Sequence, residues 1–323
     1  MDEPIIQLIN ISKKYGDFTA VKNLDLTINR GEIFGLLGPN GSGKSTTILM
    51  MLGLTEPSSG EVRVCGINST RHPIEVKKKV GYLPEDVGFY DDRSATENLV
   101  YTAMLNGIAK KEAVGKAEML IQRVGLNISN KKTGKFSKGM RQRLGLADVL
   151  IKDPEIIILD EPTSGIDPKG VRDFLNLIVE LRNEHGISIL FSSHNLQHVQ
   201  QVCDRIGIFM EGELKAVGDI NSLSEELLKN GRFLLEIGVD SSGNPENKVT
   251  LDWFKKLSGD MEGIESVTEE NGLFRIQSIH DISIDISKRI MEAGYNLNFL
   301  NKKRFGIEAI YNYLIEGGSA NAN

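Results

Sequence analysis

The nine residues from Gly38 to Thr46 have the spacing G-x-x-x-x-G-K-[ST], which is typical of loops that bind nucleotide phosphates. Glycines let such a loop curl so that successive backbone N–H groups point at anionic oxygens. We expect Lys44 to reach the β- and γ-phosphates and the Ser45 hydroxyl to ligate Mg²⁺. The candidate phosphate-binding residues are Gly38, Pro39, Asn40, Gly41, Ser42, Gly43, Lys44, Ser45 and Thr46.

A second candidate for chemistry is the acidic pair Asp160 and Glu161, which directly follows an apolar run at 156–159. Taken alone, such a pair is more often a strand end that enters solvent. A chain that also carries a phosphate-binding loop reverses that preference. We then expect Asp160 to hold the Mg²⁺ shell and Glu161 to polarise the water that attacks the γ-phosphate.

Strands and helices must position these motifs. The apolar run at 33–37 predicts a buried strand before the phosphate loop, and the run at 47–52 predicts a helix after it. Continuous apolar runs at 156–159 and 187–191 are typical of strands buried on both faces, with a helix at 169–184 between them. Strands that alternate with helices in this way predict a parallel α/β core.

Other elements surround this predicted core. Residues 5–11 and 22–29 alternate apolar and polar side chains, which indicates strands of an antiparallel sheet. Shorter strands are predicted at 61–66 and 80–84, and residues 94–150 have apolar positions at helical spacing.

The pattern changes near residue 220. Beyond that point we expect strand 232–239, helix 250–259, strand 264–269, strand 273–278, helix 281–293 and strand 296–302. This βαββαβ order predicts a small α+β domain of the ferredoxin-like kind, with Trp253 and Phe254 in its core. We therefore expect a nucleotide-binding domain over 1–220, an accessory domain over 221–316 that ends in a helix at 307–316, and a disordered tail over 317–323.

Composition narrows the class of protein. The chain has 323 residues, 40% hydrophobic and 25% charged, as is usual for a globular protein. A net charge of −6 does not suggest a general nucleic-acid surface, so we expect no nucleic-acid partner. Two distant cysteines suggest no disulfide framework and fit a reducing cytosol. Neither a secretory signal nor a run of 18 apolar residues is visible, so we expect any membrane role to come through a partner.

Taken with further motifs, these residues resemble the nucleotide-binding domain of an ATP-binding cassette (ABC) transporter. That family has a P-loop NTPase fold with a parallel core sheet, an antiparallel β subdomain and a helical subdomain. The resemblance runs from about residue 5 to residue 220. In the family's order the matching residues are Tyr15, the loop 38–46, Gly81-Tyr82-Leu83-Pro84-Glu85, the signature Phe136-Ser137-Lys138-Gly139-Met140, Asp160-Glu161, Ser164-Gly165-Ile166-Asp167 and Ser193-His194.

The resemblance implies a role for each residue. Tyr15 is expected to stack on adenine, and His194 to touch the γ-phosphate and orient Glu161. Ser137 and the N–H of Gly139 are expected to donate to the γ-phosphate from the start of a helix. In the family this last contact crosses a head-to-tail dimer, so two chains complete two ATP sites. The expected catalytic residues are Glu161, His194 and Lys44.

The resemblance also implies cofactors and partners. The cofactors are ATP and Mg²⁺, and the expected metal ligands are Ser45, Glu85 and Asp160. The partners are a second cassette, in a homodimer or as the other half of a heterodimer, and an integral-membrane permease that the segment 81–85 senses. The chain would then be cytoplasmic and peripheral on the inner face of the cell membrane, and it would couple ATP hydrolysis to transport.

Three positions depart from the family's usual pattern. Glu85 replaces a glutamine, Lys138 replaces a glycine, and Met140 replaces a glutamine. Lys138 is compatible both with a solvent-facing position and with contact to the second cassette. This variant pattern resembles a bacterial and archaeal export-type branch, with which an appended C-terminal domain is compatible. The transported substrate does not follow from the sequence.

Two other functions fit less well. Soluble cassette ATPases that act on ribosomes carry two cassettes in one chain, and those that act on chromosomes carry long coiled-coil insertions; neither layout occurs here. A module that binds ATP without hydrolysis is disfavoured by the intact catalytic residues. His194, His198 and Cys203 resemble a metal-binding spacing, but we favour a switch histidine, an exposed helix position and a small packing residue.

Overall fold

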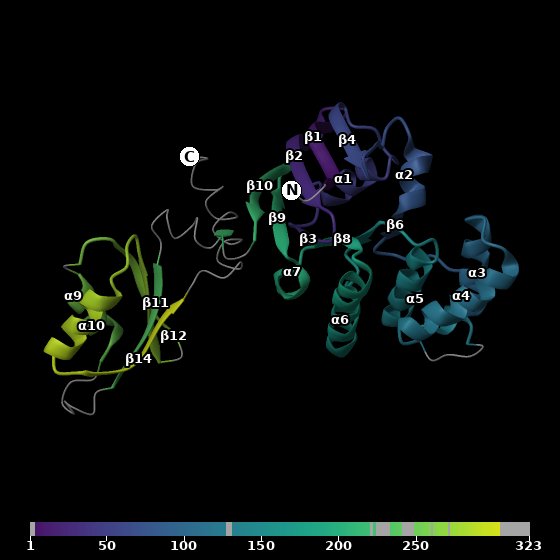
Figure 1. Ribbon diagram of the computed structural model, residues 1–323. Helices are drawn as coiled ribbons and strands as arrows, with labels where there is room; N and C mark the ends of the chain where they lie inside the picture. The colour runs from purple at the N-terminus through teal and green to yellow at the C-terminus, as the bar shows by residue number, and fades with distance from the viewer. Residues whose placement is uncertain are drawn as a thin grey trace. The chain divides into compact units, whose positions relative to one another are not determined.

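The computed structural model describes residues 4–126, 131–219, 222–223, 233–240, 249–259, 261–270 and 272–303. The chain forms two compact units, Met1–Gly218 and Asp219–Asn323, which Figure 1 shows as ribbons. The predicted helix at 307–316 and the predicted tail at 317–323 lie outside the described residues. In the part that the structure describes, no helix is both long and apolar enough to cross a membrane.

An antiparallel sheet forms one layer of the first unit, as the alternating sequence predicts. Its strands pair in the order β2-β1-β4-β5. Alternate side chains of β2 are buried from Leu24 to Ile28, whereas β1, whose pairing with β2 shifts register, buries both Ile5 and Ile6 and exposes Ile9. These strands are β1 (Pro4–Tyr15), β2 (Phe18–Asn29), β4 (Ser59–Val64) and β5 (Ile67–Asn68).

A six-stranded sheet lies at the centre of the first unit, in the order β10-β9-β3-β8-β7-β6. Pairing is parallel from β9 through β6, which confirms the predicted parallel α/β core. The strands are β3 (Ile33–Leu37), β6 (Val80–Leu83), β7 (Ile156–Asp160), β8 (Ser188–Ser193), β9 (Arg205–Met210) and β10 (Glu213–Gly218). The β9–β10 hairpin was not predicted. Every residue of β3, β7 and β8 is buried, which explains their continuous apolar runs.

The helices of the first unit form two groups. Helices α1 (Lys44–Met51), α2 (Pro73–Lys79), α6 (Pro168–His185) and α7 (Leu196–Val202) connect strands of the two sheets. Helices α3 (Ala95–Leu105), α4 (Lys110–Arg123) and α5 (Lys138–Leu150) gather at one end of the unit, with a short 3-10 helix, η1 (Thr133–Lys135), before α5 (Figure 1). This second group is the predicted helical subdomain.

Local signals start these helices where the structure has them. Ser94 and Glu97 form a reciprocal capping box at the start of α3, and the Asp167 side chain accepts from Gly170 N at the start of α6. Gly186 ends α6 in the left-handed conformation that favours glycine.

The second unit has the predicted βαββαβ order. Its sheet is fully antiparallel in the order β12-β13-β11-β14, which is the arrangement of a ferredoxin-like fold. The elements are β11 (Phe233–Asp240), α9 (Leu251–Ser258), β12 (Ile264–Glu270), β13 (Leu273–Ser278), α10 (Ser283–Glu292) and β14 (Asn296–Lys303). Phe254 is fully buried and stacks on Phe274, while Trp253 packs edge-on against Tyr295.

Candidate active site

The phosphate loop connects β3 to α1 in a conformation that requires its glycines. Gly41 and Gly43 have φ angles of 79° and 109°, which residues other than glycine rarely adopt. A Cβ on Gly38 would lie 2.2 Å from the carbonyl oxygen of Phe209. Because α1 begins at Lys44, the N–H groups of its first turn have no acceptor within the helix and carry the positive end of its dipole. The loop is therefore shaped to receive an anion.

Lys44 is buried at the base of this loop, where it is 5% exposed. Its Nζ donates to the carbonyl oxygens of Gly38 (2.7 Å) and Pro39 (3.2 Å) and lies 3.7 Å from Glu161 Oε1. Burial lowers the pKa of Lys44, while the carboxylates of Glu161 and Asp160 oppose that shift. The ammonium group is thus held in the loop by acceptors that phosphate oxygens can replace.

Asp160 ends β7 beside this loop. Burial raises the pKa of its carboxyl, against the opposing influence of the Ser192 and Ser45 hydroxyls and the Lys44 charge. The charge of Glu85, an exposed residue after β6, raises that pKa further, so Glu85 lies close enough to act on Asp160. Oδ1 of Asp160 is buried without a hydrogen-bond partner. Such an orphaned oxygen is a free acceptor beside the loop.

Glu161 and His194 form the second half of the site. One carboxylate oxygen, Oε2, lies 2.9 Å from His194 Nδ1, and the other, Oε1, is buried without a hydrogen-bond partner. Glu161 is 8% exposed and has a φ of 47°, a strained backbone conformation for a residue with a side chain. Its N–H donates to the carbonyl of Ser192, which holds this geometry. Asp160 is only 7% exposed, so the acidic pair does not enter solvent as a simple strand end would.

Parallel strand geometry explains why these residues meet. The carboxyl ends of four parallel strands lie at one edge of the central sheet. There β3 leads into the phosphate loop and β6 into Glu85, while β7 ends at Asp160, just before Glu161, and β8 leads into His194.

The structure leaves the other predicted nucleotide contacts outside this cluster. Ser137 is the N-cap of α5 and its hydroxyl accepts from Met140 N, while Gly139 lies one residue into the helix. Between these described residues and the loop 38–46 there is no hydrogen bond or ion pair. Tyr15 is half exposed at the end of β1, with Lys13 Nζ 4.9 Å from its ring centre.

Two features of the site were missed or misplaced by sequence analysis. Ser192 was not predicted, although it lies buried next to Asp160; its position just before the Ser193–His194 motif is the only sequence signal for it. His198 is half-buried rather than exposed, because its Nδ1 lies 3.0 Å from Thr163 Oγ1. Burial lowers the pKa of His198.

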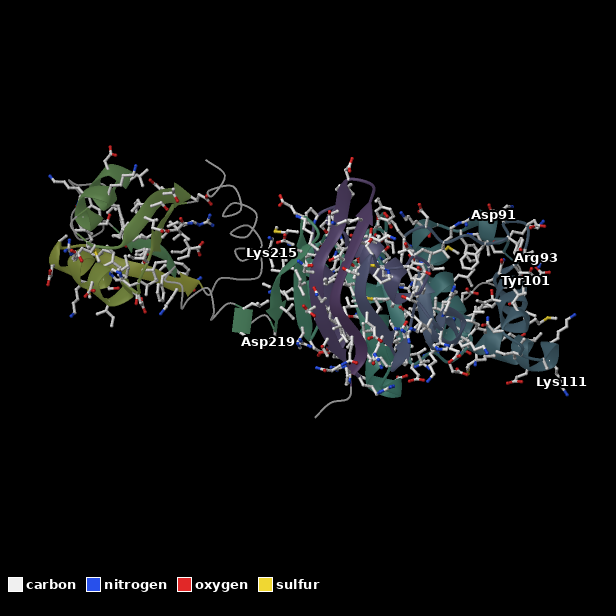
Figure 2. All side chains as sticks on the ribbon, turned by 90° about the horizontal axis from the view of Figure 1, so that it is seen from above. Asp91, Arg93, Tyr101, Lys111, Lys215 and Asp219 are labelled. Carbon is white, nitrogen blue, oxygen red and sulfur yellow. The ribbon has the colours of Figure 1, made fainter. Side chains whose placement is uncertain are left out.

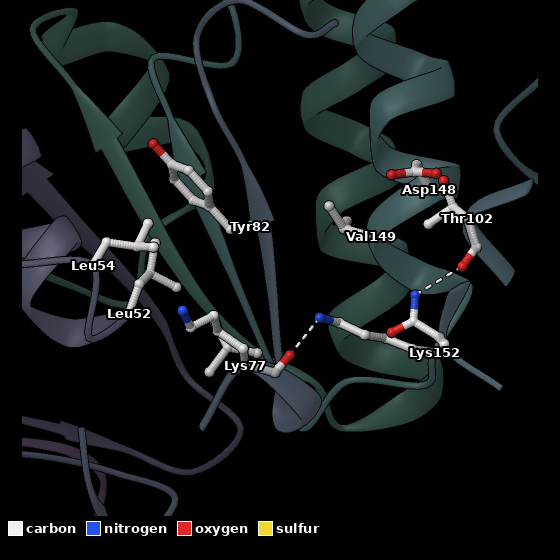
Figure 3. A pocket seen from close by; sticks show the side chains of 10 residues that line it. Leu52, Leu54, Lys77, Tyr82, Thr102, Asp148, Val149 and Lys152 are labelled. Carbon is white, nitrogen blue, oxygen red and sulfur yellow. Dashed lines mark hydrogen bonds between the residues drawn. The ribbon is translucent and has the colours of Figure 1, made fainter. Parts of the chain in front are cut away.

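A cavity of about 230 Å³ opens between the central sheet and the helical subdomain. Tyr82, which belongs to the predicted partner-sensing segment 81–85, is one of the residues that line it (Figure 3). Lys152 Nζ donates to the carbonyl of Lys77 across the lower side. The residues that line the cavity are Leu52, Leu54, Lys77, Val80, Tyr82, Thr102, Asn106, Asp148, Val149 and Lys152. The lining combines apolar side chains with the charged groups of Lys77, Asp148 and Lys152.

Comparisons with known proteins agree with this geometry. The ABC transporter family model matches residues 21–164. The bacitracin transport ATP-binding protein BcrA of Bacillus licheniformis is 35% identical over 98% of both chains. The linearmycin resistance ATP-binding protein LnrL of Bacillus subtilis is 39% identical over 73% of this chain and 75% of its own.

Solved structures of ATP-binding cassettes are similar to about two thirds of the chain. The cbiO1 subunit of the cbiONQ ABC transporter complex from Clostridium perfringens has a TM-score of 0.64 at 28% identity, covering 71% of this chain and 93% of its own. A dimeric ATP-binding cassette bound to ADP and Pi in a post-hydrolysis state has a TM-score of 0.61 at 27% identity, covering 66% of this chain and 98% of its own.

Proposed function

Because this chain belongs to the ABC transporter family and is one of its ATP-hydrolysing subunits, we propose that two copies close head to tail on two ATP molecules and drive a separate membrane permease. The chain then lies on the cytoplasmic side of the membrane through that permease. Two relatives are named for bacitracin transport and linearmycin resistance, which favours export of an antibiotic.

The main support for a role of Glu161 in hydrolysis is that its two carboxylate oxygens have different surroundings. His194 holds Oε2, while Oε1 is buried, has no hydrogen-bond partner and faces Lys44 at 3.7 Å. A carboxylate held in this way is suited to accept a proton from water. Water oxygen attacks the γ-phosphorus, the bond to the ADP oxygen breaks, and Oε1 takes the water proton.

Lys44 stabilises the same reaction by charge. When ATP enters, its phosphate oxygens replace the Gly38 and Pro39 carbonyls as acceptors of the ammonium group. The N–H groups at the start of α1 bind the remaining phosphate oxygens. The backbone N–H groups are fixed before ATP arrives, so little reorganisation of the loop is needed as charge develops.

The acidic and hydroxyl side chains fit a magnesium ion. Mg²⁺ prefers oxygen ligands, and Asp160 has one buried oxygen, Oδ1, without a hydrogen-bond partner. The Asp160 carboxylate interacts with the Ser45 hydroxyl and with the charge of Glu85. These three residues would hold Mg²⁺, which neutralises phosphate charge when bound.

A second cassette completes each site in this proposal. Ser137 and Gly139 stand at the start of α5, where N–H groups and the helix dipole attract an anion, yet they have no bond to this chain's own phosphate loop. They therefore suit the ATP bound by another copy.

The cavity beside Tyr82 supports contact with the permease. Its apolar side chains suit a helix or turn from that subunit, and Leu54, one of them, is 54% exposed. Leu54→Asp should remove permease binding without affecting ATP binding by the isolated chain. Ile74→Asp is the matched control, because Ile74 is also exposed (69%) but does not line the cavity.

The test is an affinity purification from detergent-solubilised membranes with Mg-ATP, using the slow variant Glu161→Gln as bait. A multi-spanning membrane protein in equal amount, lost with Leu54→Asp and kept with Ile74→Asp, is the expected result. Recovery of ribosomal or DNA-bound proteins instead would favour a cassette ATPase that works away from membranes.

A further inference from the structure

The end of the β1–β2 hairpin carries a lysine and a tyrosine whose side chains are in contact. β1 and β2 are the two long purple strands that lie side by side in Figure 2, and a turn joins them after Tyr15. Lys13 Nζ lies over the Tyr15 ring, 4.9 Å from its centre, which is within the range of a cation–π contact. One face of this ring is therefore covered by an ammonium group.

The ammonium group of Lys13 is held in place by a second contact. Its Nζ donates to the carbonyl oxygen of Glu56 at 2.7 Å, in the turn between α1 and β4. Two further bonds fasten that turn to β1, from Ser58 N to the Ser12 carbonyl (2.7 Å) and from Lys14 N to Ser58 Oγ (3.0 Å). Three hydrogen bonds thus fix the position from which Lys13 meets the ring.

No aromatic ring covers the other face of Tyr15 in the described part of the chain. Tyr15 is 48% exposed, and none of the ring pairs there includes it. Phe18, its direct neighbour across the hairpin, is 64% exposed. An exposed aromatic ring with one covered face is suited to stack a nucleotide base on its free face.

The hairpin end also lies beside the phosphate loop. An added Cβ on Gly43 would lie 2.5 Å from the carbonyl oxygen of Ala20 and 3.5 Å from the Val21 side chain. Ala20 follows Phe18 by two residues, which span about 7 Å of strand. A nucleotide whose phosphates bind the loop can therefore reach the Tyr15 ring with its base.

We propose that Lys13 is a positioning residue for the base of ATP, because it holds the Tyr15 ring from one face and leaves the opposite face for the base. The inference rests on the proposed function, since it requires ATP in the loop 38–46. A ring that is already immobile loses little further freedom when a base stacks on it, which favours binding. The effect concerns the base alone, because among the described residues Lys13 has no hydrogen bond or ion pair with the loop 38–46.

Two ligands separate an effect on the base from an effect on the phosphates. Inorganic tripolyphosphate has the phosphate chain of ATP without a base. Lys13→Met keeps a stem of similar length but removes the ammonium group. It should raise the Kd for Mg-ATP, measured by calorimetric titration, about 2- to 5-fold, as expected for loss of a cation–π contact. The Kd for tripolyphosphate should stay unchanged, and Lys13→Arg should restore most of the ATP affinity.

Lys14→Met is the matched control, because it removes the same charge from the neighbouring residue, whose side chain is exposed. It should leave the Kd for ATP unchanged. In a Tyr15→Leu background, Lys13→Met should have no further effect on ATP binding, because the ring through which Lys13 acts is gone.

The Tyr15 ring can also be observed without nucleotide. In the chain labelled with fluorotyrosine, the fluorine NMR signal of Tyr15 is assigned by its absence from Tyr15→Phe. This signal should shift with Lys13→Met and stay in place with Lys14→Met.

Four results would overturn the proposal: an unshifted Tyr15 signal, an unchanged Kd for ATP, equal losses of affinity for both ligands, or an undiminished effect of Lys13→Met without the Tyr15 ring. A wild-type chain that binds no ATP would contradict the proposed function instead. The fluorine signal would then still decide whether Lys13 holds the ring.

Discussion

At the scale of single residues, the proposed catalysis depends on holding one carboxylate in an uncommon environment. Glu161 is buried, its backbone is strained, and its two oxygens have different neighbours. Burial of a carboxylate without full pairing costs stability, and strain of this kind is found where function requires it. The direct His194 contact and the nearby Lys44 charge are what keep the side chain in place.

Glu161→Gln should separate binding from hydrolysis. Glutamine keeps the size of the side chain and the contact with His194, but it cannot accept a proton at neutral pH. We expect kcat to fall about 100- to 10,000-fold, the usual contribution of a general base. The Kd for ATP, measured by nucleotide titration, should change little. Turnover close to the wild-type rate would remove Glu161 from the mechanism.

At the scale of elements, the phosphate loop has two glycines with positive φ angles, 79° at Gly41 and 109° at Gly43, and with different surroundings. An added Cβ on Gly43 would lie 2.5 Å from the Ala20 carbonyl and 2.7 Å from the Phe209 ring, whereas one on Gly41 would meet nothing within 4 Å. Gly41→Ala should cost about 1 kcal/mol of unfolding free energy from backbone strain alone. Gly43→Ala should cost about 2 kcal/mol more, because backbone atoms must also move.

Thermal unfolding of both variants without nucleotide tests this difference independently of ATP contacts. Equal losses of stability would mean that packing around Gly43 yields easily, and that the loop is shaped by φ preferences alone.

In the second unit, an ion pair between Asp281 and Lys302 of β14 makes stability depend on pH. Partial burial opposes ionisation of Asp281, but the Lys302 ammonium and the hydroxyl and N–H of Ser283 outweigh it and lower the pKa to about 2. Because the folded pKa lies below the unfolded value of 3.8, the ionised form stabilises the unit above pH 3.8 and this contribution is lost as pH falls through 2. Both side chains are more than a third exposed, so solvent screening limits the effect to about 1 kcal/mol.

Asp281→Asn should therefore lower the free energy of unfolding at pH 7 by up to about 1 kcal/mol and have little effect near pH 2. Fluorescence of Trp253, the chain's single tryptophan, reports unfolding of this unit during a urea titration. Glu269→Gln, an exposed change on β12, is the control. A stability difference that persists unchanged to pH 2 would show that ionisation of Asp281 is not its source.

The elements also show which features a sequence can reveal. The strand at 33–37 is predicted to the residue, because a fully buried strand needs an unbroken apolar run. The position of His198 could not be foreseen, since its partner Thr163 is 35 residues away and only the fold brings them together. The same holds for Lys138, whose contacts with Gly165 and Asp86 come from two distant loops.

At the scale of the whole molecule, the proposed function requires one copy to hold complementary halves of two different sites. The phosphate loop, Asp160, Glu161 and His194 meet at one edge of the central sheet, while Ser137 and Gly139 begin α5 without any bond to that loop. Two copies arranged head to tail would join each half to its complement. This arrangement makes a prediction that does not depend on the identity of the permease.

Lys44→Ala damages only the phosphate-loop half, and Ser137→Arg damages only the α5 half. A pair of identical variant chains then has no intact site, but a mixed pair has one, made from the loop of the Ser137→Arg chain and the α5 start of the Lys44→Ala chain. We expect a mixture of the two variants to hydrolyse ATP several-fold faster than either variant alone at equal total concentration. A mixture no faster than its components would place Ser137 outside the site of the other copy. Such a result would leave hydrolysis to the single chain, in which Glu161, His194 and Lys44 already lie together.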